Sequence, residues 1–215
     1  MSMSSALLDT LGERDQSNRI YGVVVALVTN TDDPAKIGRV KLKYPWLGED
    51  AEGYWARVAS PMTGKEMGFY FMPDVDSEVL VAFEQGDVRF PYVIGSLWNG
   101  KDKPPLASAN GKNDIRLIKS RSGHTVRLVD EDGKEKIEII DKTGKNSISI
   151  DTAKNSITIT SAKDVTISAP DGAIKLEAQN IQLKSSAETK IESGAGMDVK
   201  ASGAMNVKGA TVNIN

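Results

Sequence analysis

The side chains that could do chemistry in this chain are few. The chain has one histidine, His124, which follows Ser122-Gly123, and it has no cysteine. A metal site built on imidazole or thiolate needs further ligands of these kinds. We therefore interpret His124 as a solvated or structural residue.

Carboxylates are more numerous, but their spacing does not indicate a site. The run Asp130-Glu131-Asp132-Gly133 lacks the spaced ligands and closing glutamate of an EF-hand, so we predict an exposed turn. Asp141, Asp151 and Asp164 lie between apolar segments, where turn-forming residues are usual. No phosphate-binding glycine loop and no nucleophile-histidine set can be assembled. We therefore expect no catalytic residue, no cofactor-binding residue and no metal ligand, and the protein is predicted not to be an enzyme.

A repeat of aliphatic pairs dominates the C-terminal part of the chain. Each row reads apolar, polar, apolar, which is the period of a strand with one buried face, and turn signals such as Asp-Gly and Thr-Gly separate the rows. The eleven rows are Val126/Leu128, Ile137/Ile139, Ile148/Ile150, Ile157/Ile159, Val165/Ile167, Ile174/Leu176, Ile181/Leu183, the incomplete row at Ile191, Met197/Val199, Met205/Val207 and Val212/Ile214.

Two inward residues per strand cannot bury a core alone, so the rows must stack on one another or on other chains. Single-chain solenoids use coils of about twenty residues or more, which is longer than the steps here. We predict an intertwined triple-stranded β-helix, with the Ile, Leu and Val side chains of the paired rows as the trimer core. At the usual strand spacing it would form a needle roughly 50 Å long. An ordinary meander and a single-chain solenoid are the alternatives.

The composition describes a folded protein. Of 215 residues, 40% are hydrophobic and 26% are charged, and the net charge is −2. The absence of cysteine excludes disulfides. Met1–Asp15 lacks a basic region followed by an apolar run, and Val23–Val28 is too short to span a bilayer. We expect no signal peptide and no transmembrane segment.

Two modules of different chemistry share the chain. Every aromatic residue lies between Tyr21 and Trp98, and a Pro/Gly/Ser-rich stretch follows. Residues 1–19 carry Leu7, Leu8 and Leu11 and are either a short docking helix or a frayed tail. The predicted division is 1–19 tail or docking segment, 20–105 barrel, 106–125 linker or neck, and 126–215 spike repeat.

The first module reads as a series of short strands. Five or six such strands in so short a segment predict a small closed barrel. In one of them, Val79, Val81 and Phe83 alternate with Leu80 and Ala82, so both faces are expected to be at least partly buried. The expected strands are Tyr21–Thr29, Arg39–Tyr44, Tyr54–Ala59, Gly68–Met72, Glu78–Phe83 and Tyr92–Leu97.

These strands also carry a resemblance to a known family. The motifs are Gly38-Arg39-Val40-Lys41-Leu42-Lys43-Tyr44-Pro45-Trp46-Leu47, Trp55-Ala56-Arg57-Val58-Ala59-Ser60-Pro61, Gly68-Phe69-Tyr70-Phe71-Met72-Pro73, Glu78-Val79-Leu80-Val81-Ala82-Phe83-Glu84-Gln85-Gly86-Asp87 and Pro91-Tyr92-Val93-Ile94-Gly95-Ser96-Leu97-Trp98-Asn99-Gly100. With these motifs, about residues 20 to 105 resemble, in order and spacing, the OB-fold domain of VgrG spikes and phage baseplate assembly protein V. Asp74-Val75-Asp76 departs from the family, in which a glycine often precedes the acidic pair.

The resemblance implies an all-β spike: an N-terminal OB-fold barrel followed by a trimeric β-helix. It implies a homotrimer at the baseplate of a phage tail or related contractile injection system, assembled in the cytoplasm and seated on a separately encoded hub. It further implies transient contact with a target envelope on contraction. The needle ends without the His-x-His pair of some relatives, so a PAAR-type tip protein is expected at Asn213, Ile214 and Asn215.

Two alternatives come from other functional classes. OB folds often bind single-stranded nucleic acid through aromatics in a basic groove. Here acidic residues outnumber basic ones before residue 107, and the aromatic residues Tyr44, Trp46, Trp55 and Phe83 are expected to pack in the barrel instead. We therefore expect no nucleic-acid partner. A tailspike-like, glycan-processing β-helix needs paired carboxylates and aromatic platforms for sugars, and no aromatic follows Trp98.

Overall fold

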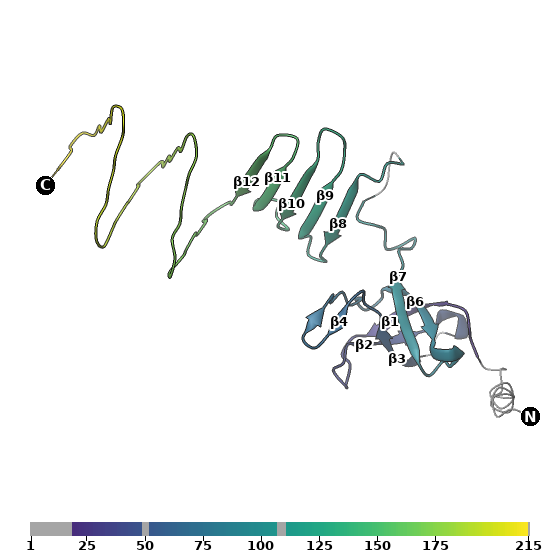
Figure 1. The fold of residues 1–215 in the computed structure, drawn as a ribbon. Coiled ribbons are helices and arrows are strands. Elements are labelled where there is room, and N and C mark those ends of the chain that lie inside the picture. Colours follow the sequence, from purple (N-terminus) through teal and green to yellow (C-terminus); the bar gives the residue numbers. More distant parts are fainter. Residues whose placement is uncertain (1–18, 49–51, 107–110, 215) are drawn as a thin grey trace, which may run out of the picture. The chain divides into compact units, whose positions relative to one another are not determined.

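The structure is a computed structural model that describes residues 19–48, 52–106 and 111–214. The chain divides into two compact units, Met1–Thr160 and Ser161–Asn215 (Figure 1). Over the described ranges, no helix is both long and apolar enough to cross a membrane. The residues expected to form an N-terminal docking helix or tail lie outside the described residues, except Arg19.

Five strands of the first unit close into a barrel in the order β1-β2-β3-β7-β6. All neighbours pair antiparallel except β3 and β7, which are parallel. This arrangement is consistent with an OB fold and confirms the predicted closed barrel. The strands are β1 (Val24–Asn30), β2 (Arg39–Lys43), β3 (Glu52–Val58), β6 (Glu78–Phe83) and β7 (Pro91–Ser96), with 3-10 turns η2 (Pro45–Leu47) and η3 (Glu84–Gly86).

The barrel core comes from alternate positions of these strands. In β6, Val79 and Val81 are fully buried and Phe83 is 8% exposed, whereas Leu80 and Ala82 are half-buried on the outside. Both faces of β6 are therefore covered to different degrees, as predicted. The buried apolar residues are Ala26, Val28, Val40, Leu42, Tyr44, Ala56, Val79, Val81, Phe83 and Val93.

The strand predicted at Gly68–Met72 is wrong. The chain instead forms a hairpin of two very short strands, β4 (Thr63–Gly64) and β5 (Met67–Gly68). Gly68 has φ +145, and a Cβ there would lie 2.6 Å from the Met62 carbonyl oxygen. The left-handed backbone at Gly68 ends the strand because only glycine adopts it without strain. The aromatic run that follows is exposed.

The aromatic residues expected to pack the barrel divide into two groups. Tyr44 and Phe83 are buried, with ring centroids 5.9 Å apart. Trp46 is 48% exposed, so the prediction that it packs in the core is wrong. Trp55 points outward, where Arg39 and Lys41 lie over its ring. The error arose because the sequence shows aromatic character but not which face of a strand each ring occupies.

A second sheet forms within the same unit as a simple antiparallel meander. Its order is β12-β11-β10-β9-β8, so every strand pairs with its neighbour along the chain (Figure 1). The first strand lies inside the segment 106–125, which was predicted to be a linker or neck. The strands are β8 (Ile115–Lys119), β9 (Thr125–Val129), β10 (Lys136–Ile140), β11 (Ser147–Asp151) and β12 (Ser156–Thr160).

The second unit has no assigned strand over its described residues, 161–214. Figure 1 shows it as extended segments joined by bends. The rows from Val165/Ile167 onward lie in these segments. A strand is assigned from ladder hydrogen bonds to a neighbouring segment, and this part of the chain supplies no such neighbour of its own.

Candidate assembly surface

Four rows of the repeat lie in register on one face of the meander. One ladder runs Ile118, Val126, Ile139, Ile148, Ile159, and the other runs Leu128, Ile137, Ile150, Ile157. Side chains directly opposite one another across antiparallel strands lie about 5 Å apart. The rows therefore form a continuous apolar surface, which we call the row face.

The row face is exposed to solvent. Relative exposure of its side chains ranges from 40% at Val126 to 71% at Ile157. Fully burying a side chain of this size stabilises a protein by about 1.5–3 kcal/mol, so much of this energy is unused in the single chain. A contiguous apolar surface on a soluble protein marks an interaction site.

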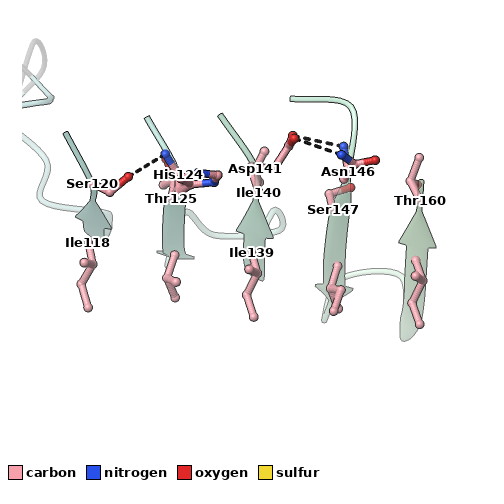
Figure 2. Close-up of a pocket in the computed structure, with 13 residues that line it drawn as sticks. Ile118, Ser120, His124, Thr125, Ile139, Ile140, Asp141, Asn146, Ser147 and Thr160 are labelled. Carbon is pink, nitrogen blue, oxygen red and sulfur yellow. Dashed lines mark hydrogen bonds between the residues drawn. The ribbon is translucent and has the colours of Figure 1, made fainter. Parts of the chain in front are cut away.

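Part of the row face is hollowed. One ladder, from Ile118 to Ile159, lines a depression of about 480 Å³ together with polar residues at the strand ends (Figure 2). In Figure 2, Ser120, His124, Asp141 and Asn146 lie at one end of the strands, and Ile118 and Ile139 lie further along. The hollow is apolar along the strands and polar only at its rim.

The rim residues hold turns. The His124 backbone N–H donates to Ser120 Oγ at 3.0 Å, and His124 Nδ1 accepts from the Lys142 backbone N–H at 3.2 Å. Asp141 accepts from the backbone N–H and side-chain amide of Asn146. Burial opposes ionisation of Asp141, but hydrogen bonds from Thr143 and Asn146 outweigh it and lower its pKa to about 2. These contacts give His124 and Asp141 structural roles in this sheet.

The acidic run after β9 also forms a turn. Glu131 pairs with Lys134 at 2.7 Å, and this hydrogen bond lowers the pKa of the glutamate. The Lys134 backbone N–H donates to the Glu131 carbonyl, as in a tight turn. Among the residues that the structure describes, no three His, Asp or Glu side chains gather where they could hold a metal ion.

The opposite face of the meander carries both charged and aliphatic side chains, and Val129 on this face is only 8% exposed. Glu138 lies between Arg127 and Lys136, with the Arg127 Nε at 2.8 Å and the Lys136 Nζ at 3.1 Å from its carboxylate. Burial opposes ionisation of Glu138, but the two cations outweigh it and lower its pKa. The charges of Arg127, Lys136 and Glu138 are thus paired on this face, whereas the row face has no cover among the described residues.

The remaining predicted core residues lie in the second unit and are also exposed. Ile167 is 70% exposed and Leu183 is 78% exposed. At the predicted tip, Ile214 is 89% exposed and Asn213 is exposed, and Asn215 lies outside the described residues. The other predicted core residues here are Val165, Ile174, Leu176, Ile181, Val199, Val207 and Val212, all more than 45% exposed.

Three bends of the second unit are closed by a serine hydrogen bond that we did not predict from the sequence. Ser161, Ser185 and Ser193 each donate through Oγ to the carbonyl oxygen three residues later, at 3.1, 2.8 and 2.8 Å. Such local side-chain hydrogen bonds favour turns over regular structure. The serine at the start of each of these three bends was the available signal.

The comparisons with known proteins concern the barrel. Residues 24–98 match the family described as the Type VI secretion system/phage-baseplate injector OB domain. Similar proteins include the type VI secretion system spike protein VgrG5 of Pseudomonas aeruginosa, 38% identical over 95 residues, which is 40% of this chain and 12% of VgrG5. VgrG2a from the same species is 35% identical over 77 residues, 33% of this chain and 9% of VgrG2a.

A third relative is described as an actin cross-linking toxin. This protein, VgrG1 of Vibrio cholerae, is 33% identical over 72 residues, 32% of this chain and 7% of VgrG1. The chain thus spans about a tenth of the length of the relatives it matches. The match covers the barrel strands from β1 to the end of β7. Over residues 24–98 the chain is therefore similar to the injector OB domain of type VI secretion systems and phage baseplates, and the likeness to the VgrG spike proteins concerns that domain.

Proposed function

We propose that the protein is the central spike of a contractile injection machine, a homotrimer whose C-terminal repeats form an intertwined β-helical needle. Three OB barrels form a collar on a separately encoded hub, and the needle points away from it. The proposal rests on the OB-domain match together with the apolar rows that follow it.

The observation that carries the proposal is the exposed row face. Its Ile, Leu and Val side chains continue in register across β9–β12 and recur through the second unit. Three copies with these faces turned inward would form a triangular prism with a dry aliphatic axis. In this arrangement β8–β12 of each chain forms one wall, and the extended segments of residues 161–214 pair with those of other chains.

The proposed mechanism is mechanical. Sheath contraction drives tube and spike into the target envelope, and the spike then leaves the tube end. A closed prism suits this task because separating its chains breaks many ladder hydrogen bonds at once, and it presents no lateral sheet edge. The final row, in which Ile214 is exposed, is the proposed binding site of a PAAR-type tip protein.

Native mass in solution tests the proposal. The trimer has an expected mass near 70 kDa, three times the chain mass of 23.2 kDa. Sedimentation or native mass spectrometry distinguishes the trimer from the single chain. A species of 23.2 kDa at micromolar concentration would mean that the rows have no partner chain, and it would contradict the proposed needle.

A further inference from the structure

The two strand ends of the β8–β12 meander carry opposite charge. The turns that follow β8 and β10 lie at one end of the strands, where Figure 2 labels Ser120 and Asn146. These turns, 120–124 and 141–146, contain three lysine or arginine side chains and a single carboxylate, Asp141. We call this side of the sheet the cationic end.

The lysines of the cationic end are available to a partner. Lys142 and Lys145 are exposed, and neither forms an ion pair with another described residue. The carboxylate of Asp141 already accepts hydrogen bonds from Thr143 and Asn146 within the turn. Lys142 and Lys145 are therefore the charges that this end can offer to another chain.

The opposite strand end is acidic. The turn between β9 and β10, residues 130–135, contains four carboxylates and one lysine. That lysine, Lys134, pairs with Glu131 at 2.7 Å. Asp132, at the tip of the turn, is exposed and has no ion pair within the described part of the chain. We call this side of the sheet the acidic end.

Two other cations near the acidic end already have partners. Lys154, in the turn between β11 and β12, pairs with Asp151 at 2.9 Å. Arg116 lies 3.4 Å from the carboxylate of Asp130. Even with Arg116 counted, carboxylates outnumber cations around the turn 130–135, so this turn keeps a surplus of negative charge.

Threefold symmetry would bring the two ends together, and this step rests on the trimer proposed above. In a closed ring of three identical chains, each interface joins two different patches of the chain. If each meander is one wall of the prism, with its strands running around the axis, the cationic end of one chain meets the acidic end of the next at every corner.

The strand order fixes which turns meet at a corner. Symmetry places a given residue of all three chains at the same height along the axis, and neighbouring strands are about 4.8 Å apart. Since the chain alternates between the two ends, the turn 130–135 lies in height between the turns 120–124 and 141–146. It falls about 5 Å from each of them along the axis.

We propose that the acidic turn 130–135 of each chain docks between the two cationic turns of the neighbouring copy, with Asp132 facing Lys142 and Lys145. The aliphatic rows do not fix the register, because a slip of two strands again places rows against rows. The charged turns do, since such a slip would remove the acidic turn from between the cationic ones. Opposite charges across an interface favour one register and penalise the others.

Disulfide trapping tests the corner in the full-length protein, which has no cysteine of its own. Lys142→Cys with Asp132→Cys places one thiol at each strand end. Within one chain, a strand of five residues, about 17 Å long, separates these positions, and a disulfide needs Cα atoms within about 7 Å. Any link must therefore join two chains. The expected product of mild oxidation is a covalent trimer on a non-reducing gel.

The matched control places both thiols at the cationic end. In Arg121→Cys with Lys142→Cys the positions are two strand spacings apart, about 10 Å, so less than about a tenth of chains should link. Native mass of the same samples separates the corner from the needle. A trimer without the link between positions 132 and 142 would overturn the corner alone. A species of 23.2 kDa would overturn both proposals.

Charge reversal tests whether the ion pairs hold the corner. Lys142→Glu or Asp132→Lys alone puts like charges together at three corners. In urea that half dissociates the unmodified trimer, each is expected to lower the trimer fraction at least fivefold. The double variant restores opposite charges and should return the fraction to within about twofold of the unmodified protein. Sedimentation measures the fraction.

Lys65→Glu is the control for the reversals, because it makes the same charge change at an exposed position of the β4–β5 hairpin. It should leave the trimer fraction unchanged. Single reversals that match this control would overturn the proposed pairing, and so would a double variant that associates no better than the single ones.

Discussion

Strands β6 and β10 have the same alternating pattern and opposite burial. In β6 the aliphatic positions Val79 and Val81 are fully buried, because the barrel closes around them. In β10 the corresponding positions, Ile137 and Ile139, are 44% and 51% exposed, because the meander has two open edges and an uncovered face. The alternation indicates that a face is to be buried, but it does not indicate whether the same chain buries it.

This difference predicts two kinds of mutant. Substitutions in the barrel change the stability of a fold that a single chain completes. Substitutions on the row face have little effect on the stability of the single chain and instead change its assembly.

The largest effect is expected from deleting residues 126–215. The barrel retains its closed strand order and its buried core, so the truncated protein is expected to fold but to associate only weakly. Native mass combined with a thermal melt checks both parts. A fully trimeric truncated protein would show that the collar, and not the needle, drives assembly.

Replacing Ile157 or Ile159 with Asp tests the inward orientation of the rows. An unpaired carboxylate at the axis carries a desolvation cost of several kcal/mol, multiplied threefold in a trimer, so the trimer is expected to be lost. Thr158→Asp is the matched control, because Thr158 lies between them and points to the opposite face of β12. If Ile157→Asp trimerised as well as the control, the inward assignment would be wrong.

In the barrel, Leu42→Ala is expected to cost about 2–5 kcal/mol of unfolding free energy, since Leu42 is fully buried and its loss leaves a cavity. The neighbouring Lys41→Ala, which points outward, should change stability by less than about 1 kcal/mol. Denaturant unfolding measures both. Ile139→Ala on the row face should instead leave the unfolding of the barrel unchanged, which sharpens the comparison between the regions.

The smallest predicted effect is a pH dependence in the β1–β2 loop. Asp33 is 5% exposed, and the Arg39 guanidinium and the backbone N–H groups of Ile37 and Ala35 hold its pKa well below the usual range. The ionised form therefore stabilises the fold above about pH 4, and this contribution is lost as the pH falls further. Asp33→Asn is expected to flatten the acid limb of melting temperature against pH.

The control for this profile is Asp32→Asn at the exposed neighbouring position. It should retain the acid limb of the unmodified protein. If the profile for Asp33→Asn paralleled that of the unmodified protein down to pH 2, Asp33 would not be a cause of the loss of stability in acid.

The barrel strands were predictable because the closed barrel buries the alternating apolar residues that identify a strand in the sequence. Arg39–Lys43 and Glu78–Phe83 are examples. The hairpin at Gly68 was missed because a run of aromatic residues resembles a strand. The sequence does not show that Gly68 adopts a positive φ. Strand β8 was missed because Ile115, Leu117 and Ile118 do not form the clean pair of the other rows. The row face was predicted as a set of residues; their burial remains a prediction, because it depends on other chains.

The ladder that ends at Thr160 also sets an order of events during synthesis. Contacts in the β8–β12 meander are all between consecutive strands, and such local pairing closes quickly and within one chain. The rows of residues 161–214 emerge after the meander and have no partner strand among the described residues of their own chain. In the proposed trimer, folding therefore runs from barrel to tip, and its final phase slows on dilution, whereas the earlier phases do not.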